Sequence, residues 1–136
     1  MRAIGWLALL VVATGCGSGD DPKEDRPAAP AAKLEVVAPN TGGGDFRYAQ
    51  RRLDAPAGRV ELVLVNHDAH QHDVKLQTGT RCCYESGAKD VGGTDVITKG
   101  TTKAVVELDA GDYVFFCSVP GHADDGMQGR LTVTAG

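Results

Sequence analysis

The clearest strand pattern in the sequence is Gly111-Asp112-Tyr113-Val114-Phe115-Phe116-Cys117. The segment is rich in aromatic and β-branched residues, which is typical of a β-strand. Because successive side chains of a strand point to opposite faces, Tyr113, Phe115 and Cys117 share one face. We expect that face to point into a hydrophobic core, so a single cysteine ends a buried strand.

The connection after this strand carries two more potential metal ligands. It runs Ser118-Val119-Pro120-Gly121-His122-Ala123-Asp124-Asp125-Gly126-Met127, which gives the spacing Cys-x4-His-x4-Met. A buried cysteine alone behaves as a small hydrophobic residue. A thiolate, an imidazole and a thioether at short spacing instead suit copper at low coordination number, provided that a second imidazole comes from elsewhere.

We expect that second imidazole from His72. Residues 66–71 are predicted as a polar connection, and residues 72–77 as an alternating strand that places His72 on the core side with Val74 and Leu76. His70 is the main alternative, because strand parity does not separate it from His72. Otherwise His67 and His70 are interpreted as solvated loop histidines, although their spacing could bind a surface metal.

The remaining segments predict an all-β protein. Strand patterns cover residues 34–38, 59–65, 96–97, 104–108 and 130–133, with extended residues near 46–53 and a polar, glycine-bearing segment at 78–94. No segment has sustained helical periodicity. About seven to eight short strands with turn signals between them indicate a Greek-key β-sandwich.

The N-terminal quarter of the sequence predicts export. Residues 1–15 have a short positive start, an apolar run and small residues before Cys16, as in a bacterial lipoprotein signal peptide. Cys16 is the expected lipid attachment site, with simple release and a retained anchor as the alternatives. Residues 16–33 are predicted to form a flexible acidic, Pro/Ala-rich linker, and residues 34–136 the folded domain.

The net charge narrows the classes of partner that the protein can have. The formal net charge is −4, which argues against nucleic acid as a partner and is compatible with either a cationic redox partner or simple solubility.

Cys82 and Cys83 are adjacent, and an ordinary trans peptide holds their Cα atoms only about 3.8 Å apart, closer than in common disulfides. A vicinal disulfide, two free thiols, an intermolecular bridge and a second copper site all stay open.

With these residues, the sequence resembles the cupredoxins, the type 1 (blue) copper proteins that include plastocyanin, azurin, auracyanin and rusticyanin. The resemblance covers roughly residues 34–135, and the loop spacing is closer to auracyanin and rusticyanin than to plastocyanin. It implies one copper ion held by Cys117, His122, an axial Met127 and the upstream His72. The binuclear copper A centre on the same fold needs a second loop cysteine, and Gly121 stands in its place.

One residue departs from the family pattern, because Asp73 follows the upstream histidine where asparagine is usual. We expect Asp73 to accept a hydrogen bond from the hydroxyl or backbone N–H of Ser118 and thereby join the two ligand-bearing segments. Its negative charge is expected to favour the cupric form, unless the acid is neutralised or turned outward.

The resemblance implies a one-electron carrier rather than an enzyme, with His122 as the electron port. Phe116 is a candidate for a second contact region or for burial. Expected partners are a cytochrome or a membrane electron-transfer complex, together with the membrane itself through the lipid. The expected location is the periplasm or the outer face of a bacterial membrane. The alternative function is an extracytoplasmic copper chaperone or sensor without redox turnover.

Overall fold

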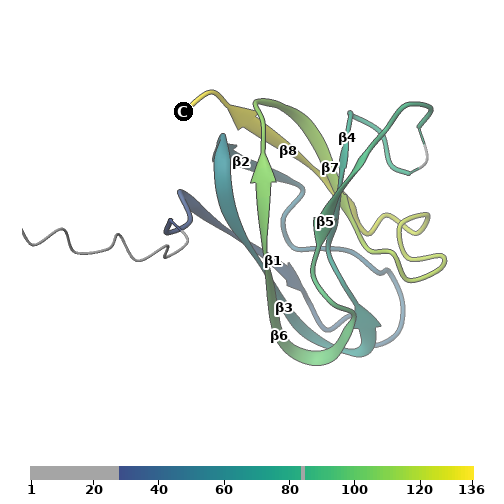
Figure 1. Ribbon diagram of the computed structural model, residues 1–136. Helices are drawn as coiled ribbons and strands as arrows, with labels where there is room; N and C mark the ends of the chain where they lie inside the picture. The colour runs from purple at the N-terminus through teal and green to yellow at the C-terminus, as the bar shows by residue number, and fades with distance from the viewer. Residues whose placement is uncertain (1–27, 84) are drawn as a thin grey trace, which may run out of the picture.

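Eight strands make up the framework of the described residues, 28–83 and 85–136, in a computed structural model (Figure 1). They are β1 (Ala32–Ala38), β2 (Arg52–Pro56), β3 (Gly58–His72), β4 (Lys75–Thr78), β5 (Asp90–Gly93), β6 (Ile97–Leu108), β7 (Gly111–Phe116) and β8 (Gln128–Thr134). The predicted signal peptide, the lipid site Cys16 and the linker up to residue 27 lie outside the described residues. The last two residues assigned to that linker, Ala32 and Lys33, belong to β1.

The strands form two sheets. One has the order β1-β3-β6 and the other the order β2-β8-β7-β4-β5. β1 pairs with β3 and β2 with β8 in parallel, and the other neighbours are antiparallel. No helix in the described part of the chain is long and apolar enough to cross a membrane. The predicted all-β sandwich is confirmed.

The core lies between the two sheets and is filled by alternating side chains of both. Leu62 and Leu64 of β3 meet Leu76, Phe115 and Leu131 of the second sheet in one buried cluster. Each of these side chains is at most 1% exposed. Burying one such side chain contributes about 1.5–3 kcal/mol, so this cluster fixes how the two sheets face each other.

β3 is longer than the sequence indicated, and His72 lies at its end. It continues to His72, but its register with β6 shifts between Asn66 and Gln71. Asn66 stabilises this bulge, because its Nδ2 donates to the carbonyls of His70 (2.9 Å) and Ile97 (3.0 Å), while its Oδ1 accepts from the N–H of Asp68 (2.8 Å).

The prediction that His72, Val74 and Leu76 share one strand is therefore wrong. His72 ends β3 in the three-stranded sheet, whereas Leu76 lies in β4 of the five-stranded sheet. The chain crosses between the sheets at Asp73 and Val74, both of which are fully buried. His72 still points inward, with 1% of its surface exposed.

Two further strands differ from the prediction. β5 lies inside the segment 78–94, which was expected to have no strand because of its glycines. β2 runs from Arg52 to Pro56, further than the extended residues expected near 46–53. Since β2 is at the edge of its sheet, proline is tolerated there without the loss of a central ladder hydrogen bond.

Candidate metal centre

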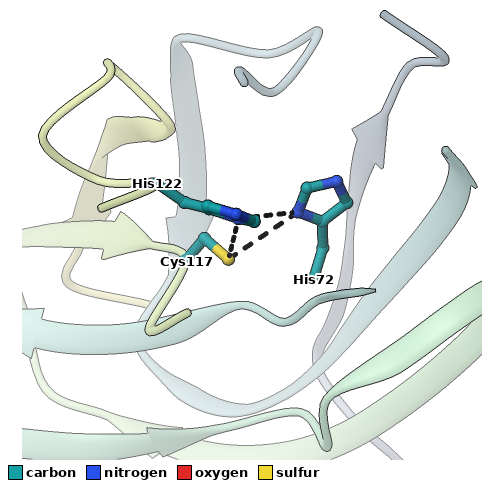
Figure 2. Close-up of side chains that lie close together, drawn as sticks. All are labelled: His72, Cys117 and His122. Atoms are coloured by element: carbon teal, nitrogen blue, oxygen red, sulfur yellow. Dashed lines mark hydrogen bonds between the residues drawn. The ribbon is translucent and has the colours of Figure 1, made fainter. Parts of the chain in front are cut away.

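Three buried side chains from both sheets come together at one end of the sandwich (Figure 2). His72 ends β3, Cys117 directly follows β7, and His122 lies on the connection between β7 and β8. The Sγ atom of Cys117 is 3.9 Å from Nδ1 of His72 and 3.6 Å from Nδ1 of His122, and the two Nδ1 atoms are 3.2 Å apart. The structure thus joins residues that are 45 to 50 positions apart in sequence.

The geometry of these atoms fits one small metal ion. Two nitrogens and a sulfur, each bonded to one ion at about 2.0–2.3 Å, lie roughly 3–4 Å from each other. All three pairwise separations fall in that range. Two neutral imidazoles that face each other through Nδ1 bring lone pairs together, and a cation between them removes the repulsion. The soft sulfur and two nitrogens suit copper.

Burial sets the protonation of the three groups in the absence of metal. It raises the pKa of the Cys117 thiol to about 11, with opposing hydrogen bonds from backbone groups. It lowers the pKa of His72, with help from the neighbouring His122, and it lowers the pKa of His122. The imidazoles are therefore kept neutral and ready to bind, whereas the thiol must lose its proton when metal enters.

Met127 lies beside these residues and is fully buried. Its backbone N–H donates to the carbonyl of His122 (3.0 Å), and its carbonyl accepts from the N–H of Cys117 (3.1 Å). These two hydrogen bonds hold the β7–β8 connection in a closed loop around the site. The role of the Met127 thioether as axial ligand stays a prediction from the family pattern.

Asp73 joins the two ligand-bearing segments as expected. Its carboxylate accepts from the backbone N–H of Ser118 (2.7 Å) and from the Ser118 hydroxyl. The acid is fully buried rather than turned outward, and the Lys75 ammonium lies 3.7 Å from Oδ2, where it offsets part of the charge. The Tyr48 hydroxyl donates to the Asp73 carbonyl, so the backbone here is fixed as well.

The sequence interpretation missed Asp68, the second buried carboxylate near the ligands. Its Oδ2 lies 3.6 Å from Nε2 of His72, on the side of the ring opposite to Nδ1. Burial alone would raise the pKa of Asp68, but hydrogen bonds from His70 and Thr41 lower it below its ordinary value. The negative charge favours a proton on Nε2, which leaves the Nδ1 lone pair free for metal.

The sequence also gave no sign that the connection between β1 and β2 covers the site. Phe46, on this connection, stacks on His122 with ring centroids 4.0 Å apart and an interplanar angle of 25°. Its ring also meets His72 and His70 edge-on, at 5.5 and 5.1 Å. The alternation of Phe46 and Tyr48 predicts an extended segment, but it does not show which residues these two rings contact.

The other candidate residues are placed as follows. His70 is half exposed and binds Asp68 through Nδ1, so His72 rather than His70 belongs to the cluster. His67 is exposed. Phe116 is 6% exposed, which decides for burial. Cys82 and Cys83 form a disulfide with each other.

Comparisons with known proteins identify the family and the fold. The family model for copper binding proteins of the plastocyanin/azurin family matches residues 35–134. No curated protein sequence matches the chain. Auracyanin B has a similar structure, with a TM-score of 0.64 and 26% identity over 79% of this chain and 91% of that chain.

Two further structures share the fold. Auracyanin A, a "blue" copper protein from the green thermophilic photosynthetic bacterium Chloroflexus aurantiacus, has a TM-score of 0.61 and 21% identity over 78% of this chain and all of that chain. Rusticyanin from Thiobacillus ferrooxidans has a TM-score of 0.55 and 24% identity over 79% of this chain and 84% of that chain. With the cluster of His72, Cys117 and His122, these matches show that the chain belongs to the plastocyanin/azurin family of copper binding proteins, the cupredoxins, and is a type 1 copper protein.

Proposed function

We propose that this protein is a one-electron carrier that works outside the cytoplasmic membrane, with one copper ion held by His72, Cys117, His122 and Met127. The observation that supports this function best is the closed, buried set of donors. His72 and Cys117 are each 1% exposed and His122 is 9% exposed.

Bound copper supplies one-electron chemistry, because two imidazoles, a thiolate and a weak thioether lie between the preferences of its two oxidation states. The protein's contribution is to keep these donors from moving. Cys117 is held between β7 and the Met127 carbonyl, and His72 is fixed between the bulge of β3 and Asp68. A donor set that hardly moves keeps the rearrangement during electron transfer small.

The same burial weighs against the alternative of a copper chaperone. A protein that hands its metal to a partner needs donors that the partner's ligands can reach. Here Phe46 covers the imidazole of His122, and the β7–β8 connection closes over Cys117. The arrangement favours passing an electron rather than the ion.

Phe46 also modifies the expected electron port. The resemblance implied that His122 itself is the port, but its ring is mostly covered by the half-buried Phe46. Around it lie the exposed Pro120 and Gly121 and the half-buried Val119 and Ala123. We take the port to be His122 together with Phe46, inside this small apolar rim.

The location and partners follow from the sequence pattern. Export by a lipoprotein signal peptide, acylation of Cys16 and a flexible linker would place the domain in the periplasm or on an outer membrane face. A tethered carrier can reach both membrane electron-transfer complexes and cytochromes. Labelled palmitate incorporated into the wild-type chain but not into Cys16→Ala would support this location, whereas equal labelling of both would contradict it.

The redox function is tested by adding cupric ion to the purified protein and recording the visible spectrum and a voltammogram. We expect an intense band in the red and a reversible one-electron wave. Cys117→Ser should abolish the band, whereas Met127→Leu should retain it with a shifted potential. A colourless protein that binds only cuprous ion would instead indicate the chaperone.

A further inference from the structure

A second redox-capable group lies next to the metal-binding loop. Cys82 and Cys83, on the connection between β4 and β5, line a hollow of about 190 Å³. Its other wall is the end of β7 at Phe116 together with the β7–β8 connection, including Ser118 and Val119. Figure 1 shows the two connections on the same side of the molecule, although they are far apart in sequence.

The three cysteines of the described residues differ in access. Cys117 is 1% exposed, whereas Cys82 and Cys83 are only half-buried and are paired with each other. Thiol–disulfide exchange requires that a thiolate can reach one sulfur of the bond, and disulfides open to solvent are the more labile ones. The exposed Arg81 precedes the pair and the exposed Asp124 lines the hollow, so charges of both signs lie near the pair.

The size of the hollow limits what can enter it. A volume of about 190 Å³ is below the roughly 300–1,000 Å³ of sites for drug-sized ligands. It therefore suits a thiol of about the size of an amino acid better than a peptide or a protein segment. The wall of Val119, Pro120 and Ala123 offers apolar contact to the part of such a thiol next to its sulfur.

We propose that Cys82 and Cys83 form a second redox site, which exchanges with small thiols in this hollow. One external thiolate attacks a sulfur of the pair and forms a mixed disulfide, and the other sulfur leaves as a thiolate. A second external thiolate then releases the first as an external disulfide. The pair gains two electrons and two protons, and two external thiols are oxidised to one disulfide.

The state of this pair also acts on the metal-binding loop. The wall of the hollow includes Ser118, Val119 and Gly121, which lie between Cys117 and His122. The disulfide restrains only these two neighbouring residues, so opening it changes the shape of this wall and loosens its packing against the loop. Cys117 also lines the hollow, but it is only 1% exposed, and the exchange itself needs none of the copper ligands.

The exchange is tested on the full, metal-free chain in cysteine/cystine buffers, followed by acid quenching, alkylation and peptide mass mapping. Before treatment we expect no alkyl label on Cys82 or Cys83. With increasing cysteine a mixed disulfide should form first, and both residues should then be alkylated together. Cystine should reverse the labelling. Cys117 should stay unlabelled throughout. Labelling of the pair in the untreated protein, or a pair that cysteine reduces only after unfolding, would overturn the proposal.

The effect on the loop is tested by amide hydrogen exchange at residues 118–124 in the same metal-free protein. We expect exchange to become several-fold faster on reduction and equally fast in the double variant Cys82→Ser/Cys83→Ser. The matched control is Thr80→Ala, an exposed change on the same connection that does not line the hollow. Unchanged exchange in the reduced protein and in the double variant would overturn the coupling to the loop.

Discussion

Two buried carboxylates lie behind the copper ligands and act on different atoms. Asp73 binds Ser118, the neighbour of Cys117, and so connects the two sheets at the site. Asp68 faces Nε2 of His72 and orients that ring. Asp73 therefore affects the charge near the metal, whereas Asp68 affects the geometry with which His72 holds the metal.

Asp73→Asn is expected to raise the reduction potential. The change removes a buried negative charge that favours the cupric ion, while the amide oxygen can still accept from the N–H of Ser118. For a one-electron couple about 59 mV corresponds to a tenfold change in equilibrium, so we expect a shift of some tens of millivolts. Lys75→Met should lower the potential, because it removes the offsetting charge 3.7 Å away. Voltammetry that shows no rise in Asp73→Asn would disprove this role.

Asp68→Asn is expected to weaken copper binding about 10- to 100-fold, the usual cost of losing a partner that orients a metal-ligating histidine. The loss arises because the neutral amide no longer favours a proton on Nε2 of His72. Affinity is measured by competition with a chelator, and the position of the visible band reports the altered geometry. Thr41→Val is the control, since it removes one hydrogen bond to Asp68 but leaves its charge. Equal affinity in Asp68→Asn and wild type would contradict the assignment.

The buried thiol makes the metal-free protein sensitive to alkali. The pKa of Cys117 is about 11 in the folded state against an ordinary value of 9.0, so the unfolded chain gives up this proton first. The stability that the thiol contributes is complete below pH 9 and is lost as the pH rises to 11. The full difference between the two pKa values corresponds to about 3 kcal/mol, most of which is lost by pH 11.

Urea unfolding at pH 8 and pH 11 measures this loss, and Cys117→Ser should lose correspondingly less. Burial also raises the pKa of Tyr48, and Cys117 adds to this shift, so the difference between the two proteins includes the coupling of Tyr48 to Cys117. If the two proteins lost the same free energy over this range, Cys117 would not be the titrating group.

At the scale of elements, two irregular segments build the surroundings of the site. The bulge near the end of β3 places Asp68 beside His72, and the β1–β2 connection places Thr41, Phe46 and Tyr48 against Asp68, His122 and Asp73. The ligands come from the end of β3 and from the β7–β8 connection, and these two irregular segments hold them.

This division explains which features the sequence predicts. The β7 strand and the Cys-x4-His-x4-Met spacing are local patterns, so the ligand candidates and the sandwich could be found from them. The bulge of β3 depends on Asn66 bonding to Ile97 across 31 positions, and the cover of His122 depends on Phe46, 76 positions earlier. No local periodicity encodes such contacts, which is why His72 was assigned to the wrong strand.

The pairing of β7 with β8 requires a glycine at position 129. Gly129 lies opposite Phe115, and an added Cβ would meet the ring of Phe115 and the carbonyl oxygen of Arg51. Because Phe115 is fully buried and cannot move aside, Gly129→Ala is expected to cost about 1–3 kcal/mol in unfolding free energy. Urea unfolding measures it, with Gly44→Ala as the control, since no atom lies near that position. Similar stability of both variants would show that the ring can adapt.

At the scale of the whole molecule, the metal joins the two sheets, because His72 comes from β3 and Cys117 follows β7. Ligands from opposite sheets make the site as rigid as the sandwich itself. Acidic groups lie on the surface at the same end, since Asp124 and Asp125 are exposed on the β7–β8 connection next to His122. The net charge of −4 has the same sign, so we expect the end that carries the proposed port to attract a cationic partner.

Asp124→Asn/Asp125→Asn is therefore expected to slow electron transfer to a cationic cytochrome several-fold at low salt, and less at high salt, because screening removes the attraction in both proteins. The potential should hardly change, since exposed charges are screened by water. Stopped-flow mixing over a series of salt concentrations gives the rates. The control is Glu107→Gln/Asp109→Asn, which removes the same amount of charge at the opposite end of the sandwich. Glu107 lies there opposite Arg59, near the start of β3. If both double variants slow the reaction equally, overall charge rather than the acidic loop guides the encounter. If neither variant slows it, charge does not attract the partner.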